Sequence, residues 1–446
     1  MYSFALRLAA LWNPKAKLWV EGRRGWRKEV SGQRSKVKGQ ELGVISQESG
    51  VGSQELSVKR QRLKVIGEET VTLSSNTIWM HCASLGEFEQ GRPLLEAVRK
   101  DYPGYKIVLT FFSPSGYEIR KNYAGADVVM YLPMDSRANA KDFINAINPS
   151  LVLWVKYEYW YYYLSELKKR KIPVLLISGI FRSSQPFFKW YGGLWKNILK
   201  CFNHFFVQTA HSKALLKNIG IDKPVTVTGD TRFDRVTAIA QQWEKLNDAV
   251  EQFCQGHPVL VAGSTWEDDE ALLIHYARAY PKTRFIIAPH EVDKERIEEL
   301  QQEFSQAVLY SSVINKTITV HADFNVLIID NVGLLSRLYK YASITYVGGG
   351  FNQSGIHNIL EAAVYGKPVI FGPVYEKFAE ARDLVDNGGA FSIETALELE
   401  ALLHQLFNNT EKLNKSSAAA KEYVQSHKGA TAQIMQYIQI KRLLMS

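Results

Sequence analysis

The sequence contains few cysteines and no long apolar run. Three cysteines occur in 446 residues, at positions 82, 201 and 254, and no two of them form a C-x-x-C pair. The small number and wide spacing of the cysteines exclude a disulfide framework and a cysteine-based zinc site, and they indicate a reducing, cytoplasmic environment. No apolar run reaches the roughly 18 residues that a bilayer requires, so an ordinary transmembrane helix is not predicted.

Acidic residues are scarce only at the front of the chain. Residues 1–65 carry 14 Lys and Arg against 5 Glu, and this segment holds the whole net charge of +9. The remaining residues are balanced. A basic segment of this kind contacts phosphate, either in an anionic membrane leaflet or in nucleic acid.

Residues 1–30 are predicted to be a membrane-surface anchor segment. The first twelve residues are apolar except for Arg7, and a basic cluster follows with Trp19 and Trp26 interleaved. A helix of this length spans about 18 Å, which is shorter than the roughly 30 Å hydrocarbon core, so we expect it to lie in the interface. The alternative is an ordinary amphipathic helix packed on its own domain.

Residues 31–75 are basic and partly repetitive. The near-copies QELGVIS, QESGVGS and QELSVKR recur with a period of seven between residues 39 and 60. Three glycine-rich repeats are too few for a coiled coil. We therefore expect a disordered, low-complexity insertion without chemistry.

From residue 76 onward, short apolar runs alternate with amphipathic segments, and a second such series begins near residue 258. This pattern predicts parallel βαβ units whose sheets are covered on both faces. A chain of 446 residues also exceeds the roughly 250–300 residues at which a single core stops growing. The prediction is an α/β protein with two Rossmann-like doubly wound domains, at residues 76–235 and 236–446, facing an interdomain cleft that holds the active site.

The first candidate segment is HCASLGE at residues 81–87, directly after a predicted strand. Ser84 and Gly86 are small and allow a substrate close to the backbone. Glu87 then begins a helix, where it can accept a proton from an attacking hydroxyl as the general base of an inverting sugar displacement. Alternatively, Glu87 only complements the helix dipole. A second segment, TFFSPSG at residues 110–116, offers Ser115 to a sugar but also reads as an ordinary turn and N-cap.

The third candidate segment is GGGFNQSGIHNILE at residues 348–361. Three glycines that lead into a helix can present free N–H groups to a phosphate. His357 and Glu361 are spaced to share a helix face, and Glu361 is placed to bind ribose hydroxyls. Neither nucleotide motif G-x-x-x-x-G-K-S/T nor G-x-G-x-x-G occurs here, which disfavours an ATPase or a dinucleotide dehydrogenase. A glycine-rich turn with a satisfied histidine is the alternative.

The fourth candidate group combines GSTWEDDE at residues 263–270 with APHE at residues 288–291. Ser264 and Thr265 can cap a helix or hold a phosphate. The four acids crowd the first turn of a predicted helix, where negative charge is favourable in any case, so we assign them to the helix and not to a metal.

These segments, in this order, resemble the 3-deoxy-D-manno-octulosonic acid (Kdo) transferases of lipopolysaccharide biosynthesis, a family of inverting, metal-independent enzymes with the GT-B fold. The resemblance runs from about residue 76 to the end. It rests on ASLGE, TGDTRFD, GSTWEDDE, VGGG with HNILEAA, and the segment containing Gly372, Pro373 and Phe378. Five segments in register are specific, where one would be weak.

The resemblance implies roles for individual residues. Glu87 falls on the family's catalytic base. The implied donor-binding residues are Arg232, Ser264, Thr265, His290, Gly348, Gly349, Gly350, Asn358 and Glu361. On the acceptor side we place Ser84, Gly86, Ser115, Glu158 and Arg182.

The chain departs from the family pattern in several ways: its apolar start is shorter than the anchor of many members, the heptad insertion has no recognised counterpart, and two motifs differ. It reads Ala288-Pro289-His290 where the family often has P-R-H, so one arginine is missing near the expected donor site. It also reads KYEYW at residues 156–160 where the family often has E-T-E-L-W, so Lys156 replaces the first acid while Glu158 is kept.

The predicted function is therefore an inverting transfer of Kdo from CMP-Kdo to a lipid A precursor resembling lipid IVA. The expected location is the cytoplasmic face of the inner membrane, with no cofactor, no metal and no nucleic-acid partner. One alternative is a UDP-sugar transferase or epimerase of the same fold, because a glycine turn and a ribose-binding glutamate serve any nucleotide sugar. The other is a non-catalytic, basic protein that binds membranes or nucleic acid.

Overall fold

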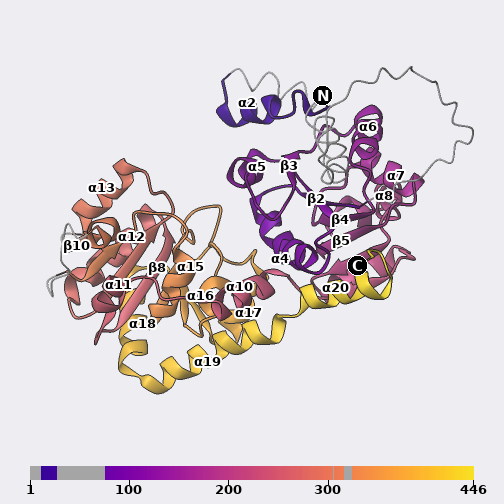
Figure 1. The fold of residues 1–446 in the computed structure, drawn as a ribbon. Helices are drawn as coiled ribbons and strands as arrows, with labels where there is room; N and C mark the ends of the chain where they lie inside the picture. The colour runs from indigo at the N-terminus through magenta and orange to yellow at the C-terminus, as the bar shows by residue number, and fades with distance from the viewer. Residues whose placement is uncertain (1–11, 28–75, 305, 316–323, 446) are drawn as a thin grey trace, which may run out of the picture. The chain divides into compact units, whose positions relative to one another are not determined.

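The computed structural model describes residues 12–27, 76–304, 306–315 and 324–445 (Figure 1). The predicted insertion at residues 31–75 and the first eleven residues of the predicted anchor lie outside the described residues. The chain divides into two compact units, the first formed by residues 1–229 with 431–446 and the second by residues 230–430. Each unit is described by itself.

The first unit is built on a parallel sheet with the strand order β3-β2-β1-β4-β5-β6-β7. Its strands are β1 (Thr77–Cys82), β2 (Lys106–Phe111), β3 (Val128–Tyr131), β4 (Leu151–Val155), β5 (Val174–Gly179), β6 (His204–Val207) and β7 (Val225–Val227). Its helices are α2 (Pro14–Glu21), α4 (Leu85–Asp101), α5 (Pro114–Arg120), α6 (Arg137–Ile147), α7 (Tyr161–Lys169), the 3-10 turn η1 (Pro186–Phe188), α8 (Gly193–Leu199), α9 (Ala210–Asn218) and α20 (Ala430–Ile440).

The strands of this sheet are mostly apolar because helices cover both faces. Successive residues of β1 point to opposite sides of the sheet. Trp79 packs in one core with Phe143 of α6, whereas Met80 packs in the other with Phe88 of α4. The predicted doubly wound architecture of this unit is confirmed.

The second unit repeats the architecture with the strand order β10-β11-β9-β8-β12-β13-β14. Its strands are β8 (Val259–Thr265), β9 (Arg284–Pro289), β10 (Ala307–Leu309), β11 (Val326–Ile328), β12 (Ile344–Val347), β13 (Val369–Phe371) and β14 (Ala390–Ser392). Its helices are α10 (Arg232–Gln241), α11 (Asp248–Cys254), α12 (Glu267–Ala279), α13 (Lys294–Glu303), α14 (Tyr310–Ile314), α15 (Leu335–Leu338), the 3-10 turn η2 (Tyr339–Tyr341), α16 (Leu360–Ala363), α17 (Ala379–Asp386), α18 (Ala396–Asn408) and α19 (Thr410–His427).

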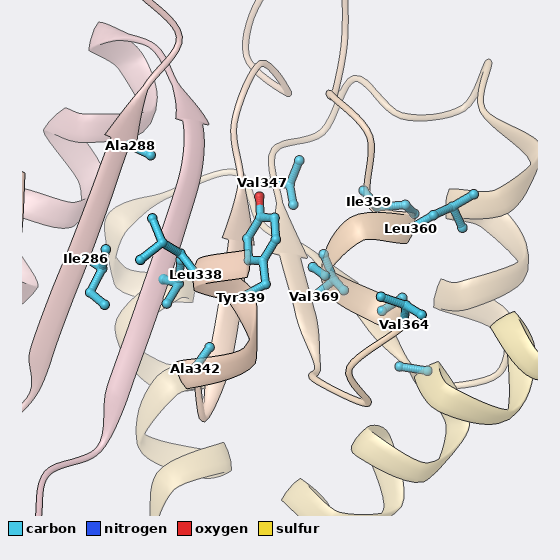
Figure 2. Close-up of a cluster of buried hydrophobic side chains, with 14 of the residues drawn as sticks. Ile286, Ala288, Leu338, Tyr339, Ala342, Val347, Ile359, Leu360, Val364 and Val369 are labelled. Atoms are coloured by element: carbon cyan, nitrogen blue, oxygen red, sulfur yellow. The ribbon is translucent and has the colours of Figure 1, made fainter. Parts of the chain in front are cut away.

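Two apolar cores lie on opposite faces of this second sheet. Figure 2 shows part of the first, in which Leu338 and Tyr339 pack between Ile286 of β9 and Val347 of β12. The other core joins the sheet to α12, α13 and α18. As in the first unit, the strands are short, parallel and almost wholly buried.

The end of the chain returns to the first unit, which differs from the predicted division at residue 236. Ile434 and Ile438 of α20 are fully buried in the core that contains Met80 and Phe88. The predicted boundary also falls inside α10, which the structure places wholly in the second unit. Apolar spacing predicts that a helix buries one face, but it does not say against which sheet.

The described part of the predicted anchor packs on the first unit. Asn13 caps α2 by accepting the N–H of Ala16 at 3.1 Å. Trp19 is buried against Phe112, and Arg23 donates to the carbonyl oxygen of Phe112 at 2.6 Å. α2 follows the predicted twelve-residue helix, whose first eleven residues lie outside the described residues, so the choice between an interfacial and a packed helix stays a prediction. Within the described ranges, no helix combines the length and apolarity needed to cross a bilayer.

Candidate functional site

The first unit places its polar residues where β1 and β4 lie side by side. The chain leaves β1 toward β2 on one side and leaves β4 toward β5 on the other. The loops beyond the carboxyl ends of these strands therefore diverge, and this is the position at which doubly wound sheets bind ligands. Glu87 lies in the first turn of α4 after β1, and Glu158 lies in the loop after β4.

Glu87 is a buried carboxylate held by backbone donors. Its side chain accepts a hydrogen bond from the N–H of Ala83, a second backbone bond comes from Tyr157, and the residue is 7% exposed. Burial raises the pKa of Glu87 to about 7, and the charge of Glu158 adds to the rise, while the two backbone N–H groups and Lys156 oppose it. A general base is most effective when its pKa lies near the working pH, so this environment suits proton abstraction.

A buried histidine holds Glu158 in place. The ring of His81 is fully buried and lies 3.1 Å from Glu158 Oε2 through Nε2 and 2.9 Å from Thr110 Oγ1 through Nδ1. Trp160 also donates to Glu158 Oε2 at 2.9 Å. When Nε2 carries a proton it can donate to Glu158, and Nδ1 can accept from the Thr110 hydroxyl. Sequence reasoning gave His81 no role, although a histidine in an apolar strand was a signal.

The remaining acceptor-side residues lie at the same edge of the sheet. Ser84 is the N-cap residue of α4, and a Cβ at Gly86 would meet no described atom within 4 Å. The N–H of Ser113 donates to the carbonyl oxygen of Ala83 at 2.7 Å, which joins the loop of Ser115 to the loop of Ser84. Arg182 is exposed in the loop after β5. The structure therefore places Ser84, Gly86, Ser115 and Glu158 in loops at the same edge of the sheet as Glu87, while Arg182 lies two strands from β1.

Lys156 marks a strained point in this edge. It follows β4 with a φ of 54°, in the left-handed region that costs a non-glycine residue free energy. Ser264, near the end of β8 in the second unit, has the same φ of 54°. Backbone strain of this kind collects at functional sites. Here it occurs at a predicted donor residue and at the position where the chain departs from the family's first acid.

In the second unit, a buried aspartate fixes the glycine turn. Asp269 of α12 accepts the N–H of Gly349 at 2.9 Å, the hydroxyl of Tyr346 at 2.8 Å and the N–H of Trp266 at 3.0 Å. Burial raises the pKa of Asp269, while these donors oppose the rise. Asp269 was assigned only to the helix dipole from the sequence. The hydrogen bond between Asp269 and Gly349 joins residues 80 positions apart, so no local sequence pattern predicts it.

The three glycines are required by close packing. A Cβ at Gly348 would lie 2.3 Å from the carbonyl oxygen of Ser264, and one at Gly350 would lie 2.5 Å from the nitrogen of Gly372. Gly349 has a φ of 90°. Two of the three N–H groups are already used, because Gly349 donates to Asp269 and Gly348 donates to the carbonyl oxygen of Gly263.

The helix after the glycine turn begins later than predicted. α16 runs from Leu360 to Ala363, so His357 precedes it, and the predicted shared helix face with Glu361 is wrong. Asn358 accepts the N–H of Leu360 at 3.3 Å and donates to Glu361 Oε1 at 3.0 Å. Asn358 and Glu361 therefore form one polar unit, but a helix of one turn provides little dipole at residues 354–358.

Three rings stack beside the glycine turn. His290 stacks on both Trp266 and His357, with ring centroids 4.5 Å apart in each pair. The indole N–H of Trp266 donates to His357 Nε2 at 3.2 Å. Burial, with a contribution from His290, lowers the pKa of His357 to about 4, so this ring is neutral near pH 7. The exposed His290 therefore stacks on two uncharged rings, those of Trp266 and His357, which hold its orientation.

Two other predicted donor residues already have partners. The hydroxyl of Thr265 donates to Glu270 at 2.7 Å and is buried, so this side chain orients its loop. Arg232 forms ion pairs at 2.9 Å with Asp230 and Glu380. Burial lowers the pKa of Arg232, but the two carboxylates outweigh it and the net pKa is raised. A donor phosphate would have to compete with both carboxylates for Arg232.

Comparisons with known proteins agree on a family. Residues 57–235 match the family described as 3-Deoxy-D-manno-octulosonic-acid transferase (kdotransferase). A Bifunctional glycosyltransferase/methyltransferase of Fusobacterium nucleatum is 27% identical over 74% of this chain, and the chain spans 52% of that relative's length. A 3-deoxy-D-manno-octulosonic acid transferase of Haemophilus influenzae is 26% identical over 80% of this chain and 85% of its own.

A solved structure supports the architecture. The UDP-GlcNAc 2-epimerase of Neisseria meningitidis is 19% identical, covers 82% of this chain and 100% of its own, and superposes with a TM-score of 0.57. This likeness shows the fold alone. Two doubly wound units are the architecture of the GT-B fold, and the sequence comparisons identify the chain as a glycosyltransferase. Within that class, the chain is similar to the Kdo transferases, by the family model over residues 57–235 and by curated relatives that are 24–27% identical.

Proposed function

We propose that this enzyme transfers Kdo from CMP-Kdo to a lipid A precursor, with inversion, at the cytoplasmic face of the inner membrane. The observation that carries the proposal is Glu87, a buried carboxylate at the carboxyl end of β1 whose pKa is raised to about 7. Similarity to the Kdo transferases supports Kdo as the sugar. The lipid acceptor is consistent with the basic front end of the chain.

Glu87 removes the proton from the attacking hydroxyl of the acceptor. The N–H groups of Ala83 and Tyr157 hold the carboxylate in one orientation, and Glu158, fixed by His81, keeps it basic. Lys156 lowers the pKa of Glu87 and limits that effect. Deprotonation of the hydroxyl makes it a competent nucleophile toward the anomeric carbon, and CMP departs from the opposite face.

The second unit holds the nucleotide in this proposal. Asn358 and Glu361 bind the ribose hydroxyls, the glycine turn gives the phosphate close access to the backbone, and His290 lines the site from the stack on Trp266. Because Asp269 fixes the turn before any ligand arrives, the site is preorganised and little ordering accompanies binding.

The test replaces Glu87 and follows two readouts. Glu87→Gln keeps an acceptor for the N–H of Ala83 but cannot take a proton. We expect transfer to fall by at least about 10³-fold while CMP binding, measured by calorimetry, is retained. Glu96→Gln, on the same helix and half-exposed, serves as the control and should retain transfer. Full turnover by the Glu87→Gln variant would remove Glu87 from the mechanism.

A UDP-sugar enzyme is the second candidate, favoured by the shared fold with the UDP-GlcNAc 2-epimerase. Calorimetry of the full chain with CMP and with UDP separates the two. Kdo transfer predicts binding of CMP and little binding of UDP, and the reverse preference supports the second candidate. A non-catalytic membrane or nucleic-acid-binding protein predicts that neither nucleotide binds.

A further inference from the structure

Lys156 brings a positive charge to the loop that holds the proposed catalytic base. It follows β4 directly, and its N–H donates to the carbonyl oxygen of Ile177 in β5 at 3.1 Å. The next residue, Tyr157, donates its N–H to the carboxylate of Glu87, and the charge of Lys156 acts on the same carboxylate. The ammonium group of Lys156 lies 5.1 Å from the centre of the Tyr157 ring. A cation is therefore built into the site at Glu87.

The backbone of Lys156 adopts a conformation that favours glycine. Its φ is 54°, and a lysine in this region costs free energy that a glycine does not. The residue is partly exposed and belongs to neither apolar core of the first unit, so packing does not require a long side chain here. A glycine in its place would keep the turn and remove the charge. The role of the side chain can therefore be separated by experiment from the shape of the loop.

The reaction brings a further negative charge to this loop. Glu87 and Glu158 are two carboxylates that already repel each other, since the charge of Glu158 raises the pKa of Glu87. In a 3-deoxy-octulosonic acid, the carboxyl carbon is bonded to the anomeric carbon. At the moment of attack, the acceptor hydroxyl lies about 3 Å from both Glu87 and the anomeric carbon, so the carboxylate of the sugar also comes close to Glu87. A cation at this point offsets the repulsion.

We propose that the ammonium group of Lys156 pairs with the carboxylate of the donor sugar during transfer. The inference rests on the proposed function, because it takes Glu87 as the base and a sugar acid as the group that is transferred. A phosphate of the acceptor is the other anion that could meet Lys156. The carboxylate is favoured because covalent bonds fix its place next to the attacked carbon. The family pattern often has an acid at this position, so the pairing is a property of this chain.

Steady-state transfer by the full chain tests the pairing, with CMP-Kdo as the donor. Lys156→Gln should lower kcat/KM for the donor by about tenfold or more, because a hydrogen bond between charged groups is lost. Lys156→Glu should lower it further by repulsion, and Lys156→Arg should restore most of it. The assay is run at about pH 9, above the pKa of Glu87, so that a changed ionisation of the base does not contribute.

Two further measurements separate loss of the charge from loss of structure. Lys156→Gly should transfer as poorly as the glutamine variant, although it should melt within a few degrees of the parent chain because glycine adopts the same φ without strain. Binding of CMP, which lacks the sugar carboxylate, should be unchanged in every Lys156 variant when measured by calorimetry. Lys171→Gln is the matched control, since Lys171 is exposed, has a φ of 58° and lies at the opposite edge of the same sheet, ahead of β5. This control should transfer like the parent chain.

The outcomes distinguish the inference from the proposed function. Parent-like kcat/KM for the donor with Lys156→Gln would overturn the inference alone. A rise in the KM of the acceptor, with parent-like kcat/KM for the donor at saturating acceptor, would assign Lys156 to a phosphate of the acceptor and overturn it too. A parent chain that transfers no Kdo would contradict the proposed function and the inference together.

Discussion

Replacing Glu87 by glutamine should stabilise the protein while it abolishes transfer. The carboxylate of Glu87 is buried among groups that do not fully compensate its charge, and its pKa is raised from 4.5 to about 7. The folded state therefore binds this proton more tightly than the unfolded state does. Above pH 7 the ionised carboxylate costs folding free energy, and below about pH 4.5 it does not, because it is protonated in both states.

The magnitude follows from the two pKa values of Glu87. A difference of one in pKa between the folded and unfolded states corresponds to about 1.36 kcal/mol. The rise from 4.5 to about 7 therefore costs about 3 kcal/mol at pH 8. Glutamine has no charge to bury and can still accept the N–H of Ala83. The variant should gain up to about 3 kcal/mol at pH 8, or roughly 5–10 °C in the melting temperature of the first unit.

Thermal melts of the parent chain and the Glu87→Gln variant between pH 5 and pH 8 check this expectation. The difference in melting temperature should grow as the pH rises from 5 to about 7 and level off above that, where Glu87 is ionised in both states. Glu96→Gln is the control, because Glu96 is 51% exposed in a surface ion pair with Arg92 and should change stability by less than about 1 kcal/mol at any pH. A stability difference for Glu87→Gln that is independent of pH, or a loss of stability at pH 8, would refute the reasoning.

Three further predictions concern the same two sites. Glu158→Gln should move the acid limb of the pH profile of kcat/KM to lower pH, since the charge of Glu158 raises the pKa of Glu87; an unmoved limb contradicts the coupling. Asp269→Ala should leave buried donors unpaired, lower stability by about 3 kcal/mol or more and weaken CMP binding, as measured by urea unfolding and calorimetry. Gly349→Ala should weaken CMP binding at least about tenfold, because its φ is 90° and a Cβ would lie 2.8 Å from the carbonyl oxygen of Gly355; parent-like affinity would show that the turn can relax.

The parallel sheets were predictable because their signal is local. Short apolar runs such as VLVAGS indicate a buried strand, and helix-length spacing between two runs indicates that a helix connects two parallel strands. The candidate motifs follow from the same logic, since ligands collect at the carboxyl ends of parallel strands. Glu87 and the glycine turn were located in this way, and both lie at those ends.

The features that were missed depend on contacts between distant residues. Asp269 and Gly349 are 80 positions apart, and His81 and Glu158 are 77 apart, so neither pairing has a local pattern. Arg232 looked available to a phosphate because the carboxylate of Glu380 reaches it only after folding. The return of α20 to the first unit is of the same kind, because its apolar face fits either core by composition alone.

Sugar transfer itself can be measured by incubating the full chain with CMP-Kdo and a tetraacylated lipid A precursor and determining the mass of the lipid product. We expect a lipid heavier by Kdo with the parent chain and unmodified acceptor with the Glu87→Gln variant. Unmodified acceptor with the parent chain, together with transfer or epimerisation of a UDP-sugar, would contradict the proposed function.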